Sequence, residues 1–177
     1  MTKMLASLRA RREDDERGFT LIELMVVVLI IAILIAIAIP TFLGAKSRSQ
    51  DKSAQSSLRN AVTNAKGIYT DSETYASATT QALVDAEPSL QFTTGNSTGP
   101  KVVSVSSPDQ YTFVAAAKSS SGKCFAIADN VNGPGTVFMY VAESGNCNAG
   151  AATSAQAVPN SVPTANPGTL GEWAQSW

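Results

Sequence analysis

A single run of apolar residues, from Phe19 to Phe42, limits what this chain can fold into more than any other feature of its sequence. Its Leu, Ile, Val and Ala residues occur on every side of a helix instead of along one stripe, so such a helix needs apolar surroundings all round. Its length matches the roughly 30 Å hydrocarbon core of a bilayer at about 1.5 Å of rise per residue. We therefore predict that this segment spans a membrane.

The segments on either side of the apolar run are polar. The stretch from Met1 to Gly18 mixes basic and acidic residues, and three basic residues, Lys46, Arg48 and Lys52, follow soon after Phe42. The amino-terminal stretch holds more basic residues, which favours an orientation with the amino terminus inside the cell. An ordinary secretory signal would end in small residues and a cleavage site, and none is evident at the far end of this run.

Glu23 is an acid within the apolar run, and no basic residue lies in that run. A carboxylate in a membrane helix is costly, so it needs a partner or a function. A cut between Gly18 and Phe19 would create a terminal ammonium about one helical turn from Glu23, and such a pair can offset the cost of desolvation. The ammonium would belong either to the same chain or to a neighbouring subunit.

The run Arg-Gly-Phe-Thr-Leu-Ile-Glu-Leu-Met at residues 17–25, followed by the apolar helix with Pro40, resembles the class III signal of type IV prepilins. The resemblance covers about residues 17–53. It implies that a prepilin peptidase cuts after Gly18 and methylates the new amino group of Phe19, and that Glu23 guides subunit docking. Glycine suits the cleavage position because it lets a protease approach the backbone closely.

The pattern changes beyond the apolar run. Pro40 lacks an amide hydrogen and Gly44 is a second weak point, so we predict a helix kink there. Downstream, apolar residues recur at helical spacing and form one stripe that can pack on a sheet: Ala54, Leu58, Ala61, Val62, Ala65, Ile68 and Tyr69. A helix from Phe19 to Tyr69 would be about 75 Å long, so half of it belongs to an external domain.

The carboxyl-terminal half predicts an α+β domain. A loop with a possible short helix near residues 79–86 leads to four strand-like runs separated by turn signals, at residues 101–106, 110–116, 123–129 and 136–142. Apolar residues alternate within these runs, so one face can cover the amphipathic helix. We predict the pilin fold: a long amino-terminal helix, half hydrophobic, packed on an antiparallel sheet of about four strands.

Cys124 and Cys147 are the only cysteines, and they lie in the part expected outside the cell. We predict one disulfide, which would stabilise the domain by roughly 3 kcal/mol; two reduced thiols in a cytosolic domain are the alternative. The resemblance implies that the segment between them contributes to subunit contacts and exposed surface. The tail from Ala151 is rich in Ala, Ser and Pro, which resists a packed core, and Trp173 and Trp177 either anchor its end or hang free.

These observations predict four segments. They are a cleaved leader at residues 1–18, a long helix at 19–69 with 19–42 in the membrane or filament core, a globular head at 70–150, and a tail at 151–177. The protein would be a single-pass protein of the cytoplasmic membrane before assembly and an extracellular pilus component afterwards.

The composition argues against catalysis. The chain has 0 histidines, and it has neither a Gly-x-Ser-x-Gly elbow nor a phosphate-binding Gly-Lys-Ser/Thr loop. We predict a protein that is not an enzyme, needs no cofactor or metal and takes no small-molecule substrate. The formal net charge of -1 gives no overall field towards nucleic acid, which leaves such binding to the level of the filament.

Three functions are weighed. The favoured one is a structural subunit of a type IV pilus for adhesion, twitching motility or DNA uptake, a homopolymer whose partners include prepilin peptidase, the assembly platform, minor pilins and, before assembly, membrane lipid. The second is a pseudopilin of type II secretion, which shares the cleavage motif. The third is a membrane-anchored exported enzyme.

Overall fold

The computed structural model describes residues 18–141, 146–155, 158–159, 163 and 171–177. The chain divides into two compact units, Met1–Gly44 and Ala45–Trp177, and we call the second the head unit. Apart from Gly18, the expected leader lies outside the described residues.

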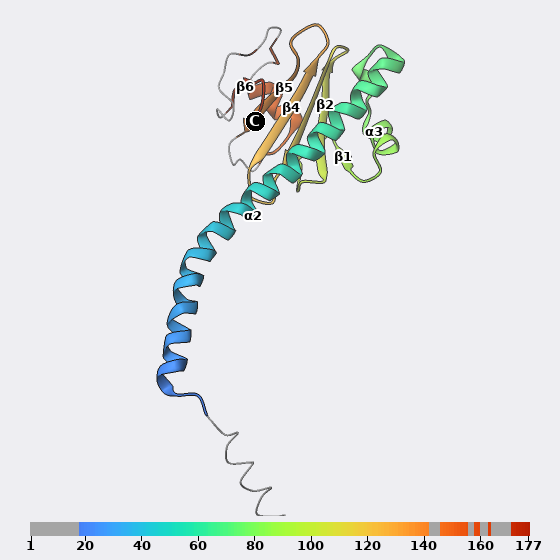
Figure 1. The fold of residues 1–177 in the computed structure, drawn as a ribbon. Helices are drawn as coiled ribbons and strands as arrows, with labels where there is room; N and C mark the ends of the chain where they lie inside the picture. The colour runs from blue at the N-terminus through green and yellow to red at the C-terminus, as the bar shows by residue number, and fades with distance from the viewer. Residues whose placement is uncertain (1–17, 142–145, 156–157, 160–162, 164–170) are drawn as a thin grey trace, which may run out of the picture. The chain divides into compact units, whose positions relative to one another are not determined.

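Helix α2, Leu21–Ser72, contributes to both units (Figure 1). It continues through Pro40 and Gly44 without a break in the helical assignment, so the kink stays a prediction. In the head unit it buries the stripe expected from the sequence, including Ala54, Leu58 and Ala61, while Ile68 and Tyr69 pack at its margin. The amphipathic half of the helix is therefore confirmed.

The described residues of the head unit form one mixed sheet of six strands, which corrects the prediction of about four antiparallel strands. The strands stand in chain order: β1 (Gln91–Thr93), β2 (Val102–Asp109), β3 (Thr112–Lys118), β4 (Cys124–Asn130), β5 (Gly135–Val141) and β6 (Trp173–Ala174). β1 runs parallel to β2, and the other neighbours are antiparallel. The two missed strands have 3 and 2 residues, too short to show an alternating pattern.

Two helical segments connect α2 with the sheet: the short 3₁₀ helix η1, Tyr75–Ser77, and α3, Thr80–Ala86. The short helix expected near residues 79–86 is thus present. β2 extends to Asp109, beyond the strand predicted at residues 101–106, and it accommodates Pro108 through a shift of register between Ser106 and Asp109. Proline is tolerated at such an irregularity because no ladder hydrogen bond from its nitrogen is needed.

The sheet is buried on both faces, although one covered face was expected. Phe113, Ala115 and Ala117 of β3 face the core formed with α2. The alternate residues Val114 and Ala116 enter a second core with the disulfide and α4, Ala149–Ala155. Two covered faces explain why β3 and β4 are almost wholly buried.

The carboxyl-terminal tail supplies part of the second cover, so the expectation that it would resist a packed core is wrong for its described ends. Ala152 of α4 is buried, and Trp173 is 2% exposed where β6 pairs with β5. Trp177 packs edge-on against Phe125 and Phe138, and its indole N–H donates to the carbonyl of Met139 at 3.2 Å. Both tryptophans therefore anchor the chain end on the sheet.

Candidate functional site

The predicted cleavage position lies just before the helix. Gly18, Phe19 and Thr20 have no helical assignment and are exposed, and α2 begins at Leu21. A methyl group added at Gly18 would meet no heavy atom within 4 Å. Packing against the described residues therefore gives no reason for glycine at residue 18.

Glu23 caps the start of α2 in the uncut chain. Its Oε2 atom accepts hydrogen bonds from the backbone N–H of Thr20 at 2.8 Å and from the Thr20 hydroxyl at 2.7 Å. In return the Glu23 N–H donates to Thr20 Oγ1 at 3.2 Å. This reciprocal arrangement is a capping box, and an acid in the first turn also suits the helix dipole.

Thr20 is a residue that the sequence analysis missed. The signal was available, because Thr-Leu-Ile-Glu at residues 20–23 matches the Ser/Thr-x-x-Glu pattern of a capping box. The box gives Glu23 a local partner before any cut, so its carboxylate is not left bare in the precursor. A cut after Gly18 would place an ammonium on Phe19, directly before Thr20.

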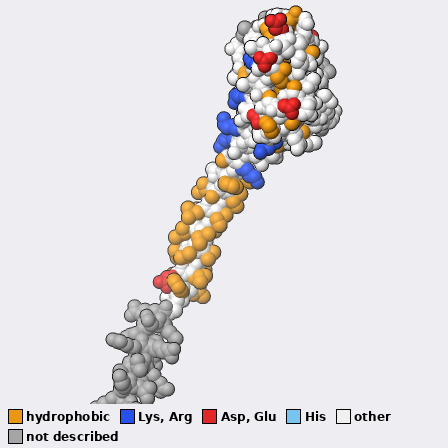
Figure 2. All heavy atoms as spheres, turned by 90° about the vertical axis from the view of Figure 1, so that its right-hand side faces the viewer, with side chains coloured by type: hydrophobic (Ala, Val, Ile, Leu, Met, Phe, Trp, Pro, Cys, Tyr) orange, Lys and Arg blue, Asp and Glu red, His pale blue; other side chains and the backbone are white. Residues whose placement is uncertain are grey.

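The apolar half of α2 exposes its large hydrophobic side chains, from 48% for Val26 to 77% for Leu21, and Figure 2 shows one face of this apolar surface. Within the described residues, α2 is the one helix long and apolar enough to cross a membrane. The hydroxyl of Thr41 donates to the carbonyls of Ile37 and Ala38, so this polar group is satisfied inside the helix. This surface needs lipid or other apolar helices around it.

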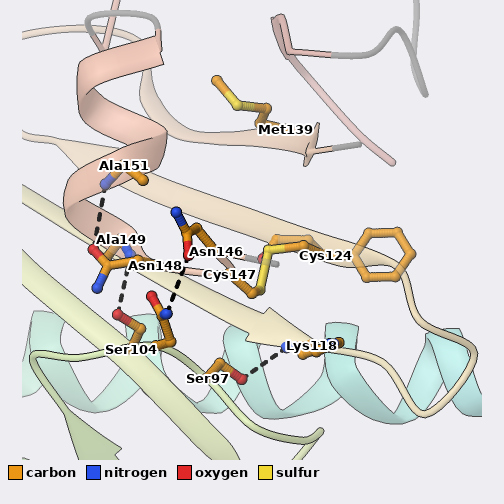
Figure 3. The surroundings of a disulfide bond; sticks show 12 residues. Ser97, Ser104, Lys118, Cys124, Met139, Asn146, Cys147, Asn148, Ala149 and Ala151 are labelled. Atoms are coloured by element: carbon orange, nitrogen blue, oxygen red, sulfur yellow. Dashed lines mark hydrogen bonds between the residues drawn. A yellow bond between two sulfur atoms is a disulfide. The ribbon is translucent and has the colours of Figure 1, made fainter. Parts of the chain in front are cut away.

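Cys124 and Cys147 form a disulfide, with their Cα atoms 5.5 Å apart (Figure 3). Both cysteines are buried in the second core. Neighbouring backbone groups are tied into the sheet: the Ser97 N–H donates to the Cys147 carbonyl at 2.7 Å, and the Ala149 N–H donates to Ser104 Oγ at 3.0 Å. The disulfide therefore fixes the chain after β5 against β2 and β4.

Asp51 is a buried acid where α2 meets the turn between β3 and β4. It accepts hydrogen bonds from the hydroxyls of Ser119 and Ser121 and pairs with Lys123 at 3.0 Å. Burial acts to raise the pKa of Asp51, but the hydrogen bonds from Ser121, Lys123 and Ser119 outweigh it and hold the pKa below its usual range. This cluster joins the helix to the sheet.

Asp129 forms a second buried cluster further along α2. It accepts hydrogen bonds from Tyr75 at 2.6 Å and from Thr136 at 2.8 Å, and it pairs with Lys66 at 2.8 Å. Burial and the hydrogen bond to this carboxylate raise the pKa of Tyr75 above its usual value. These contacts join α2 and the 3₁₀ helix η1 to β4 and β5.

The comparisons with known proteins agree with the amino-terminal features. A family model described as the prokaryotic N-terminal methylation motif matches residues 14–39. The chain therefore carries a class III signal. This signal is typical of type IV pilins and pseudopilins, and it implies processing by prepilin peptidase and assembly with other pilin subunits. No match was found among curated proteins or among solved structures.

The class III signal also indicates what kind of protein this is and where its precursor is located. It indicates a structural protein of the pilin type, and it is consistent with a precursor anchored in the inner membrane. Across the part of the chain that the structure describes, His, Cys, Asp and Glu form no group of three or more that could hold a metal ion.

Proposed function

We propose that this chain is a structural subunit of a type IV pilus, cut after Gly18, methylated on Phe19 and polymerised through the apolar half of α2. The observation that carries the proposal is the combination of the class III signal with a helix that exposes apolar side chains on all sides. The head unit is a separate compact unit with its own two cores, as expected of a domain displayed on a filament.

Assembly would transfer the apolar helix from lipid to an equally apolar bundle, so hydrophobic burial alone supplies little preference for the filament. Close packing and the charge of Glu23 must supply it. In the proposed mechanism, Glu23 exchanges its capping contact with Thr20 for the terminal ammonium of Phe19, either of its own chain or of a neighbour. Pairing between chains would also set the axial register of packed helices.

The processing step is tested by mass spectrometry of the amino terminus of the protein isolated from its own cells. The expected product starts at Phe19 and carries one added methyl group. A protein that still begins at Met1 would contradict the proposal, because the apolar helix would then be an uncleaved membrane anchor.

The filament itself is tested separately by electron microscopy of cells with and without the gene. Loss of surface filaments on deletion, restored by the intact gene, is the expected result. A pseudopilin of type II secretion shares the same signal, and it would be indicated by unchanged surface filaments together with a defect in protein secretion.

A further inference from the structure

The Lys and Arg residues of the head unit lie mostly at one of its ends. Lys46, Arg48 and Lys52 belong to the first two turns of α2 in this unit. The contacts of Asp51 place the turn between β3 and β4 beside these turns, which brings Lys118 and Lys123 to the same end. Figure 2 shows Lys and Arg side chains gathered where α2 enters the head unit.

Lys101 belongs to this group as well. It directly precedes β2, whose Val103 lies opposite Ala117 of β3, next to Lys118. Six of the eight Lys and Arg residues of the head unit therefore share one end. We call this set the basic end of the head unit: Lys46, Arg48, Lys52, Lys101, Lys118 and Lys123.

Acidic residues mark the opposite end of the head unit. Asp71 lies in the last turn of α2, Glu73 directly follows this helix, and Asp109 is the last residue of β2. The Tyr75 N–H donates to the carbonyl of Gln110, which brings these two segments together. The head unit thus has separated charges although its overall charge is close to zero.

The Lys and Arg side chains of the head unit differ in whether they have a partner within it. Far from the apolar run, Lys66 pairs with Asp129, and the Arg59 guanidinium stacks over the ring of Trp177 at 4.9 Å. Lys46, Arg48 and Lys52 are exposed, and no side chain of the described residues pairs with them. Asp51, the one acid nearby in sequence, is buried and already occupied by Lys123.

The spacing along α2 places Lys46 and Arg48 at about the level of the lipid headgroups and Lys52 just beyond them. Polar headgroups extend a bilayer from about 30 Å to about 40–45 Å, so each headgroup layer corresponds to roughly three to five helical residues. Lys46 and Arg48 follow Leu43 by three and five residues. Lys52 follows one turn after Arg48 on the same side, and long basic side chains reach back towards phosphates.

We propose that the basic end of the head unit is a binding surface for anionic phospholipids, which holds the head against the membrane before assembly. This inference rests on the membrane-anchored precursor of the proposed function. Lys and Arg residues that flank a membrane span usually lie on its cytoplasmic side. Lys46, Arg48 and Lys52 would lie on the exported side, so a compensating interaction is expected there. Anionic headgroups supply it, since Lys and Arg near such a surface each contribute attraction.

The test uses the full chain in phosphatidylcholine vesicles and measures its preference for spin-labelled phosphatidylglycerol over spin-labelled phosphatidylcholine by electron paramagnetic resonance. The wild type should favour phosphatidylglycerol. The double substitution Arg48→Gln/Lys52→Gln should lower this preference, by up to about fivefold for each cation removed. In about 1 M salt the preference should disappear, because the screening length falls to roughly 3 Å.

The matched control is Gln110→Glu/Asn132→Asp, which changes the net charge by the same amount at exposed positions of the opposite end. It should leave the lipid preference unchanged. Equal preference of the wild type for both lipids, or an equal loss in the control, would overturn the proposal. So would an unchanged lipid preference in Arg48→Gln/Lys52→Gln together with a loss of filaments, because the cations would then serve a second copy of the chain.

This readout is independent of processing and polymerisation, because it is made on the precursor in a membrane. A chain that failed to be cut after Gly18 in cells would contradict the pilus function and still allow the lipid preference to be measured. Circular dichroism of each variant checks that the head unit keeps its fold.

Discussion

The two halves of α2 place similar apolar side chains in opposite surroundings. Before Gly44, apolar residues such as Leu34 are exposed, whereas Leu58 and Ala61 are fully buried in the core between α2 and the sheet. The sequence of the first half gives no polar face, and that of the second half does. One continuous helix therefore serves two partners: its own domain along one half, and lipid or other subunits along the other.

The largest effect is expected from a substitution in the apolar half of α2, which should leave the head unit intact. Glu23→Ala should still be processed and inserted into the membrane, but it should assemble few or no filaments, because the charge that favours the bundle is gone. Filament yield by electron microscopy and processing by mass spectrometry measure the two steps. Normal filament yield would remove Glu23 from the mechanism.

Glu23→Gln separates charge from capping in the same assay. Glutamine can keep the reciprocal hydrogen bonds with Thr20, since Gln also completes a capping box, but it carries no charge. If pairing with an ammonium drives assembly, Glu23→Gln should fail as Glu23→Ala does. Recovery of filaments in Glu23→Gln would assign Glu23 a purely capping role.

The second prediction concerns the half of α2 that packs on its own sheet. Leu58→Ala should lower the free energy of unfolding of the head unit by about 2–5 kcal/mol, because it leaves a cavity in a fully buried site. Leu34→Ala, in the exposed half, should leave that free energy unchanged. Tryptophan fluorescence during denaturant titration of the full chain in detergent reports on the head alone, since Trp173 and Trp177 both belong to it.

The third prediction tests whether the disulfide acts on the head unit alone. Cys124→Ser/Cys147→Ser should lower its free energy of unfolding by about 3 kcal/mol through loss of loop closure. Membrane insertion should be unaffected, because it depends on the apolar half of α2, whereas the disulfide lies within the head unit. A loss of insertion, measured by membrane fractionation, would contradict the independence of the two regions.

The long elements could be predicted from the sequence because their patterns are strong. The apolar run is long and uninterrupted, and the amphipathic stripe with Leu58 and the alternation in β5 each leave a periodic signal. The prediction that Cys124 and Cys147 pair depended on their position beyond the membrane segment, and the disulfide is present.

The remaining features depend on contacts between distant segments. β1 and β6 are edge strands of a few residues whose pairing is decided by the neighbour, and Trp173 is buried only because the tail returns to β5. Alternation in β3 was seen, but it could not show that α4 and the disulfide cover the second face. The processing and assembly roles of Gly18, Phe19 and Glu23 depend on molecules outside this chain and stay predictions.

The smallest expected effect is a dependence on pH at the point where α2 first joins the sheet. The folded state lowers the pKa of Asp51, so the carboxylate stabilises the head unit fully above the unfolded value of about 4 and loses this contribution as the pH falls through the folded value. Between pH 6 and pH 3 the wild type should therefore lose more stability than Asp51→Asn. Asp71→Asn, an exposed acid on the same helix, should keep the pH dependence of the wild type. If Asp51→Asn instead loses as much stability as the wild type down to pH 3, the Asp51 carboxylate does not stabilise the contact between the amphipathic half of α2 and the β3–β4 turn.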